Sequence, residues 1–250
     1  MRKLITTVAA LAVLTFAGSA HANDGNIDMG WTTCAPTTTN LASIAPGTAS
    51  VAIFVSVIGL DQPHKSYEFQ IIYGRRLDPS TLAVPDAWAF DSPGCQGAAG
   101  LAIDHLSGSS KACPALMGTI SPNFQLKTAA RDGVGGYDVN LMHISVANAY
   151  PNGGAGNTTE INPAVRYFLG RIMFDHTASV NGPSDPVTCG GLENPMCFAL
   201  TSGNYVNVAD QQVMFGLAGN RSLTVGTSVG CPATPAVNST WGQIKSQYRM

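Results

Sequence analysis

Short apolar runs recur along the chain between glycine, proline and polar residues, a pattern typical of β-strands. Ser50–Ile58 (SVAIFVSVI) is dense in β-branched residues and apolar enough for a central strand. In Ser66–Tyr73 (SYEFQIIY), every second residue from Tyr67 to Tyr73 is aromatic or isoleucine, which predicts a half-buried strand. Further strands are predicted at Trp88–Phe90, Tyr137–Val146, Val165–Phe174, Cys197–Leu200, Gln211–Phe215 and Ser222–Val225.

The predicted strands follow one another without helical periodicity between them. This order predicts an all-β fold, namely an antiparallel β-sandwich of immunoglobulin-like arrangement, with a jelly roll as the alternative. Two stretches rich in glycine, asparagine and serine, Ser92–Ser110 and Pro151–Pro163, are predicted to be long loops. No repeat and no interdomain linker interrupts residues 23–232, which we therefore expect to form a single domain.

The first 22 residues have the layout of a secretory signal peptide. Arg2 and Lys3 form a short positive end, residues 4–17 are apolar and uncharged, and residues 20–22 (AHA) provide small residues for cleavage. No cysteine stands at the cleavage point, so a lipoprotein anchor is not indicated. We expect the mature chain to be secreted to the extracellular space, the cell surface or a periplasm.

The C-terminal residues 233–250 differ from the strand-rich region. Thr240 and Gln243 match a capping box, which predicts the start of a short amphipathic helix. The helix would either dock back on the sandwich or serve as an export or attachment handle for another protein. Its apolar face would consist of Trp241, Ile244 and Tyr248.

Charge and hydropathy exclude several classes of function. Without Arg2 and Lys3, the 13 basic residues become 11 against 15 acidic residues, a net charge of −4, which does not favour nucleic-acid binding. The longest later apolar run, Val51–Leu60, is shorter than the roughly 20 residues of a membrane-spanning helix. The charged fraction is 11%, against roughly 25% in ordinary soluble domains. Such a surface suits an extracellular β-protein or a subunit that packs against its own copies.

The cysteines are even in number and lie in the exported region, so disulfides are expected. Cys189 and Cys197 flank a short loop, and Cys95 and Cys113 flank a longer one, which suggests two local bridges. The remaining pair would join the ends of the domain. No CxxC motif and no nearby histidine indicates zinc. The six disulfide candidates are Cys34, Cys95, Cys113, Cys189, Cys197 and Cys231.

One catalytic motif occurs, the G-x-S-x-G pattern of residues 226–230. A nucleophile elbow requires a following helix and a later histidine, but Cys231-Pro232 follows and the last histidine is His176. A hydrolase with dispersed carboxylates remains an alternative. Its candidate residues are Asp86, Asp91 and Asp175.

Other motifs do not predict a cofactor or a metal ion. Residues 24–28 (DGNID) have the opening rhythm of a calcium loop, but Met29 and Ala35 occupy the positions that require glycine and glutamate. The histidines of the mature chain show no metal-binding spacing, and we expect them to be structural. They are His64, His105, His143 and His176.

Aromatic residues in or beside predicted loops are the candidates for contact with a carbohydrate or a protein. For Trp88, which stands between Ala87 and Phe90, packing in the core is the alternative. The four candidates are Trp31, Trp88, Tyr150 and Tyr205.

Two segments resemble the cohesin-type β-sandwich of bacterial secreted proteins. Tyr67–Tyr73, followed by residues 77–82 (LDPSTL), resembles the family's apolar strand and its Asp-Pro-Ser-x-Leu signature. Phe168–Phe174 (FLGRIMF) resembles a later Gly-x-Ile-x-Phe strand. The resemblance covers about a quarter of the chain; the six cysteines, residues 88–110 and the tail depart from it. It implies a non-catalytic sandwich. Cohesins bind dockerin modules through one sheet face, but the matching residues do not locate that face, so dockerin binding is not carried over.

These observations together predict a secreted, disulfide-bonded, non-catalytic module with a binding or structural role at a bacterial cell surface or in the extracellular space. Its partner would be a protein or a carbohydrate. The alternatives are the hydrolase described above and a self-assembling surface or fibre subunit.

Overall fold

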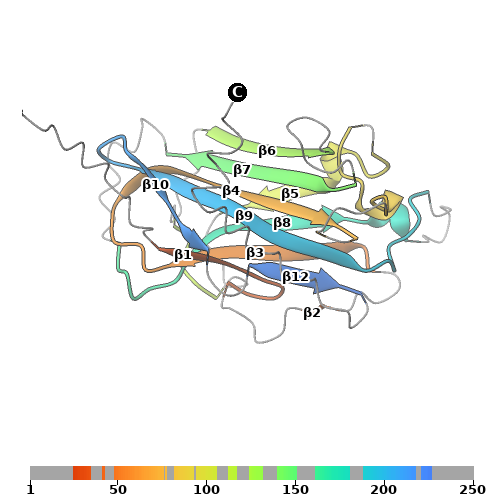
Figure 1. The fold of residues 1–250 in the computed structure, drawn as a ribbon, viewed down its shortest axis with the longest axis horizontal. Coiled ribbons are helices and arrows are strands. Elements are labelled where there is room, and N and C mark those ends of the chain that lie inside the picture. The colour runs from red at the N-terminus through yellow and green to blue at the C-terminus, as the bar shows by residue number, and fades with distance from the viewer. Residues whose placement is uncertain are drawn as a thin grey trace, which may run out of the picture.

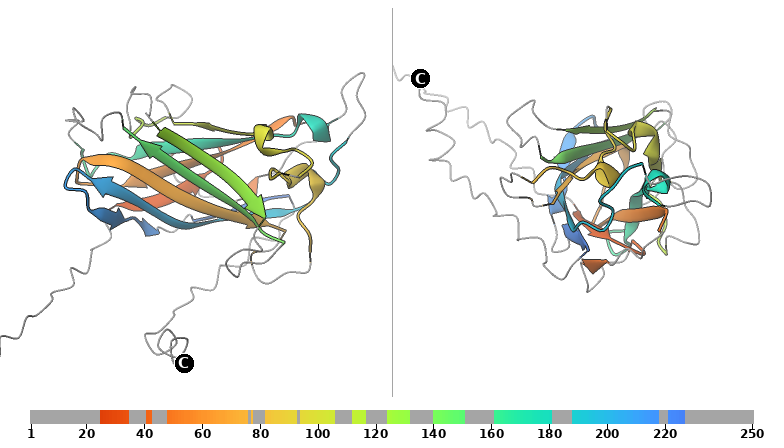
Figure 2. Two further views of the ribbon diagram at one scale, coloured as in Figure 1. Left: turned by 90° about the horizontal axis from the view of Figure 1, so that it is seen from above. Right: turned by 90° about the vertical axis from the view of Figure 1, so that its right-hand side faces the viewer.

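The structure is a computed structural model that describes residues 25–34, 41–42, 48–75, 77, 82–92, 94–105, 112–116, 124–131, 140–150, 161–180, 188–217 and 221–226. In this part of the chain, two β-sheets pack against each other and enclose one large hydrophobic core (Figures 1 and 2). Short 3-10 helices gather at one end of the sandwich, on the right in Figure 1. The described residues contain no helix long and apolar enough to span a membrane.

The smaller sheet has five strands in the order β11-β1-β3-β8-β5. Its ladders are antiparallel except for the short parallel pairing of β1 with β11. The strands are β11 (Gly216–Leu217), β1 (Asn26–Gly30), β3 (Ser50–Ile58), β8 (Tyr167–Asp175) and β5 (Leu101–Asp104).

The larger sheet has the order β2-β12-β9-β4-β7-β6, with β10 also paired to β9. Its ladders are antiparallel except for β12 with β2. The strands are β2 (Leu41–Ala42), β12 (Ser222–Val225), β9 (Met196–Asn207), β4 (His64–Gly74), β7 (Met142–Ala149), β6 (Phe124–Arg131) and β10 (Gln212–Met214).

The core forms because alternate residues of the strands point between the sheets. Met142, Ile144 and Val146 of β7 are fully buried, while the residues between them are partly exposed. Burying each large apolar side chain contributes about 1.5–3 kcal/mol. Phe198 of β9 stacks on Tyr73 of β4 with a ring-centroid separation of 5.1 Å, so aromatic packing fills the centre of this layer.

Buried tyrosine hydroxyls connect the larger sheet to β8 of the smaller sheet and to the 3-10 helix η1 (Asp86–Trp88). Tyr67 Oη of β4 donates to Leu169 O of β8 at 2.5 Å, and Tyr73 Oη donates to Trp88 O at 3.0 Å. Burial raises the pKa of Tyr67, so its hydroxyl keeps its proton and remains a donor. A buried tyrosine requires such a partner, because an unsatisfied polar group is costly inside the core.

The predicted all-β sandwich is confirmed, and β3 and β12 have the predicted bounds. The strand predicted at Trp88–Phe90 is wrong, because Asp86–Trp88 forms the 3-10 helix η1. The loop predicted over Ser92–Ser110 contains the 3-10 helix η2 (Ala98–Gly100) and strand β5. The predicted signal peptide and the predicted C-terminal helix lie outside the described residues.

Candidate functional site

Part of the outer face of the smaller sheet is covered by the segments around the Cys34–Cys113 disulfide. This bridge joins residues whose Cα atoms are 6.4 Å apart, and it holds residues 112–116 against β8. Leu116 N donates to Phe168 O, and Phe168 N donates to Pro114 O, each at 2.8 Å. Phe168 is fully buried on this face, so the part of the face around it is covered, whereas Arg171 and Asp104 on the same face are partly exposed.

A mostly buried ion pair lies on the same covered part of the face. Arg166 Nη1 lies 2.6 Å from Asp28 Oδ2 and donates to Ser56 Oγ at 3.0 Å. Ser56 Oγ donates in turn to Cys34 O at 2.8 Å. Asp28, which is the last carboxylate of the calcium-like rhythm, is therefore a strand residue neutralised by a guanidinium.

On the outer face of the larger sheet, the half around the exposed residue Glu68 is open to solvent. Glu68 of β4 lies between Ala147 of β7 and Asn204 of β9 in the strand register, and Asn204 Nδ2 donates to Glu68 Oε1. A shallow depression of about 250 Å³ surrounds this pair. We call this surface the open patch. Glu68 is exposed, Asn204 is buried beside it, and the other members are partly exposed. The patch consists of Ser66, Glu68, Gln70, Ser145, Ala147, Ala149, Ser202, Asn204 and Val206.

The opposite end of the same face is closed. Ile72 of β4 and Ala199 of β9 are buried there under Leu77 and Leu141. The open patch is thus confined to the half of the sheet around Glu68.

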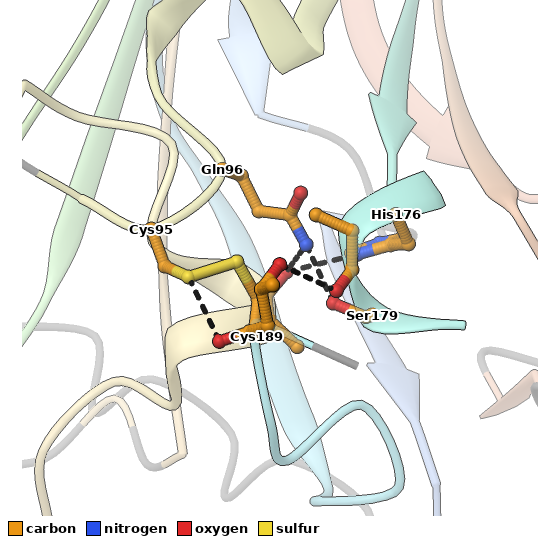
Figure 3. Close-up of a disulfide and its surroundings, with 8 residues drawn as sticks. Cys95, Gln96, His176, Ser179 and Cys189 are labelled. Atoms are coloured by element: carbon orange, nitrogen blue, oxygen red, sulfur yellow. Dashed lines mark hydrogen bonds between the residues drawn. A yellow bond between two sulfur atoms is a disulfide. The ribbon is translucent and has the colours of Figure 1, made fainter. Parts of the chain in front are cut away.

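A second candidate region is the end of the sandwich that carries the Cys95–Cys189 disulfide (Figure 3). The bridge joins Cα atoms 5.7 Å apart and ties the η1–η2 connection to the segment that precedes β9. Gln96 Nε2 donates to Ala87 O at 3.2 Å and to Ser179 Oγ at 2.5 Å. Residues distant in sequence are therefore fixed to one another at this corner.

His176 stands behind the disulfide in an aromatic environment. Its ring centroid lies 4.5 Å from that of Trp88 and 5.3 Å from that of Phe90. Nδ1 lies 2.8 Å from Ala87 O; because a carbonyl can only accept, Nδ1 carries the proton and donates. Desolvation lowers the pKa of His176 to about 4, so the ring is neutral at pH 7.

A cavity of about 510 Å³, which we call the corner pocket, opens beside this disulfide. Among the described residues that line it, Asp175 is the only charged one. Its pKa is lowered because Thr177 donates to its carboxylate through both the backbone N–H and the hydroxyl. Asp175 is therefore ionised at pH 7. The lining residues are Gln96, Ala99, Gly100, Asp175, Thr177, Ala178, Val180 and Thr188.

The third cavity, of about 570 Å³, runs between the edge strands β5 and β6. Lys127 Nζ of β6 donates to Leu101 O of β5 across it. Asp91 contributes a carboxylate to its lining.

The carboxylates proposed for a hydrolase are not brought together in these cavities. Asp91 lines the third cavity, Asp175 lines the corner pocket, and Asp86 is exposed on η1 outside both. A general acid at neutral pH needs a raised pKa, whereas the pKa of Asp175 is lowered. Among the described residues, no group of three or more His, Cys, Asp or Glu side chains is placed to hold a metal ion.

Three of the four candidate contact aromatics lie in the core. Trp88, Tyr150 and Tyr205 are at most 4% exposed, so they cannot present a ring to a ligand at the surface. Trp31 is half-buried and packs edge-on against Phe198 at 5.7 Å. The tail residues Trp241, Ile244 and Tyr248 lie outside the described part of the chain.

The predicted local disulfide pairing is wrong. The bridges are Cys34–Cys113 and Cys95–Cys189, with sequence separations of 79 and 94 residues. Cys197, which was expected to pair with Cys189, is disulfide-bonded as well. The sandwich brings distant connections together at its ends, so proximity in sequence does not indicate the pairing. The sequence likewise contains no local signal for the region around the Cys95–Cys189 disulfide, because its contacts join distant residues. Gln96 and Ser179, for example, are 83 residues apart.

No model of a protein family and no curated protein matches the chain. The structure is similar to solved cohesin modules, as the sequence resemblance predicts. One is the cohesin module of a family 33 glycoside hydrolase from Clostridium perfringens, with a TM-score of 0.36 and 9% identity over 82% of this chain and 98% of that module. Another is a type II cohesin domain from the cellulosome of Acetivibrio cellulolyticus, with a TM-score of 0.36 and 7% identity over 80% and 95%. A third is a type I cohesin–dockerin complex from Clostridium thermocellum, with a TM-score of 0.35 and 14% identity over 82% and 99%.

Proposed function

We propose that this chain is a secreted, non-catalytic binding module of a bacterial cell surface or the extracellular space, and that a protein partner docks on the open patch. The observation that carries the proposal is the difference between the two outer faces. Around Phe168, a disulfide-stapled layer covers the smaller sheet, whereas the open patch presents exposed and partly exposed side chains of β4, β7 and β9 to solvent.

The chemistry of the open patch suits a protein surface. Its depression of about 250 Å³ is below the roughly 300–1,000 Å³ of small-molecule pockets. The β7 residues beside Glu68 are alanine and serine, which allow a partner's backbone to approach closely. Glu68 and Asn204 supply polar groups for specificity.

Secretion is supported by the disulfides. The described residues contain two bridges, and bridged cysteines are typical of oxidising compartments. A rigid scaffold of this kind would keep the open patch in a fixed shape before binding, which lowers the entropic cost of association.

The experiment uses Ala147→Arg, which places a long cation in the centre of the open patch. The matched control is Ala83→Arg, at an exposed position away from the sheets. A photo-reactive residue at Ser145 identifies the partner by cross-linking in the secreted fraction of the native host. Calorimetry with the purified partner then measures affinity. We expect Ala147→Arg to weaken binding at least tenfold and Ala83→Arg to leave it unchanged.

Equal binding by both variants would overturn the proposal. Cross-links to a second copy of the chain, together with concentration-dependent oligomers in light scattering, would replace it with the self-assembling alternative.

A further inference from the structure

The corner pocket is formed by elements that do not contribute to the open patch. Its walls come from the residues after Cys95, from the end of β8 with the 3-10 helix η5 (Thr177–Ser179), and from Thr188. The Cys95–Cys189 bridge holds two of these segments together. Any ligand of this pocket would therefore bind independently of the proposed docking partner.

The side-chain donors on the pocket walls are already used inside the protein. Thr177 Oγ1 donates to Asp175 Oδ1 at 2.5 Å, and Thr177 N donates to the same oxygen at 2.9 Å. Gln96 Nε2 donates to Ala87 O and Ser179 Oγ. Thr188 Oγ1 donates to Ala178 O at 3.2 Å. A ligand that needs hydrogen-bond donors from these side chains, such as a carboxylate or a phosphate, would find them occupied.

The acceptors, in contrast, remain available. Both Thr177 donors go to Oδ1 of Asp175, and Oδ2 accepts no hydrogen bond from the described residues. Figure 3 shows the amide nitrogen of Gln96 pointing toward Ser179 and its oxygen pointing away. Thr188 Oγ1 keeps its lone pairs. The described part of the lining thus offers oxygen acceptors and one negative charge, and it contains no basic side chain.

We propose that the corner pocket binds a guanidinium or ammonium group. Arginine and lysine side chains carry only donors, so they complement the described side chains of the lining, whose donors are occupied and whose acceptors are available. Hydrogen bonds between an ionised donor and an ionised acceptor are about twice as strong as neutral ones, which gives Asp175 the leading role. The apolar residues Ala99 and Val180 would pack against the methylene groups of the ligand. The disulfide and the Gln96 hydrogen bonds hold the pocket open in advance.

The test is NMR titration of the intact, isotope-labelled protein with N-acetyl-arginine-methylamide. The neutral control ligand is the citrulline analogue, which has nearly the same shape. We expect saturable shifts of the Gly100, Thr177 and Thr188 amides with the arginine probe and at least tenfold weaker binding of the citrulline probe. Binding should weaken as the salt concentration rises. Equal binding of both probes would overturn the proposal.

Two variants locate the site. Asp175→Asn removes the charge of the pocket, and Asp86→Asn removes one charge from an exposed position at the same end of the sandwich, outside the pocket. We expect at least a tenfold loss for Asp175→Asn and none for Asp86→Asn; equal losses would contradict a site at Asp175. If Asp175→Asn fails to fold, Ala99→Arg at an exposed position should fill the pocket with its own guanidinium and block the probe. Unimpaired binding to Ala99→Arg would overturn the proposal.

Two further titrations identify the source of the cation. An arginine-containing peptide that binds more tightly than methylguanidinium supports a side chain of a protein as the ligand. Equal affinity supports a free small cation. Displacement of the probe by millimolar CaCl₂, with the same amides affected, would overturn the proposal in favour of a metal ion.

Discussion

The Nδ1 atom of His176 lies 2.8 Å from the carbonyl oxygen of Ala87, and this contact joins the end of β8 to the 3-10 helix η1. The same carbonyl accepts a hydrogen bond from Gln96. Ala87 itself donates its N–H to Gly190 O at 2.9 Å. Ala87 therefore joins three parts of the chain, at His176, Gln96 and Gly190. The histidine in this arrangement is neutral at pH 7.

We expect the protein to lose stability when the pH falls from about 6.5 to about 4. The pKa of both His64 and His176 is lowered from 6.5 to about 4 because burial disfavours the charged ring. The folded state thus favours the neutral form, and its advantage is complete above the unfolded pKa and declines as the pH falls toward the folded value. The loss should be on the order of 2–3 kcal/mol for each histidine. Urea unfolding at pH 7, 5.5 and 4.5 measures it.

His176→Gln provides the control for this prediction, because its amide can still donate to Ala87 O and does not titrate. The pH dependence should become shallower in this variant. A wild-type unfolding free energy that stays constant from pH 7 to pH 4.5 would contradict the prediction.

Replacing both Cys95 and Cys189 by serine should destabilise the protein by about 3–4 kcal/mol, because the bridge closes a long loop. Thermal unfolding measures this loss, and hydrogen exchange measures its location. The Ala87 amide, which is bonded to Gly190 O, should exchange faster, whereas amides of β7 that pair with β4 should keep their relative protection. Uniform loss of protection over both regions would show that the bridge does not act locally.

Arg166→Met should cost about 3 kcal/mol or more, because it leaves the Asp28 carboxylate without its partner at a buried position. The double variant Asp28→Asn/Arg166→Met removes the charge as well and should recover part of the loss. Chemical denaturation of the wild type and the two variants measures the difference. If the double variant is less stable than Arg166→Met, the charge of Asp28 is not the cause.

The sandwich could be predicted because its central strands have strong patterns of their own. Ser50–Ile58 and Ser66–Tyr73 alternate or cluster apolar residues strongly enough to indicate strands without any tertiary information. Phe124–Arg131 was not predicted, since its lysine, arginine and alanines have low strand propensity. It forms an edge strand only because β7 pairs with it.

The candidate sites could not be predicted from the sequence. The corner depends on contacts such as Gln96–Ser179, which join residues 83 positions apart. The open patch depends on which half of a sheet face remains uncovered, and that is decided by Leu77 and Leu141. Neither relationship leaves a local pattern in the sequence.

Lys127, whose side chain reaches from β6 to β5, affects the tendency of the protein to aggregate at high concentration. Exposed edge strands invite pairing with neighbouring molecules, and a charged side chain on the edge is a common obstacle to it. Lys127 is exposed on β6 and holds its amine against Leu101 O. A strand from another molecule that paired here would have to displace the Lys127 amine, and Leu101 O would then lose its hydrogen-bond donor. Lys127 thus opposes aggregation in a protein whose low net charge provides little repulsion between molecules.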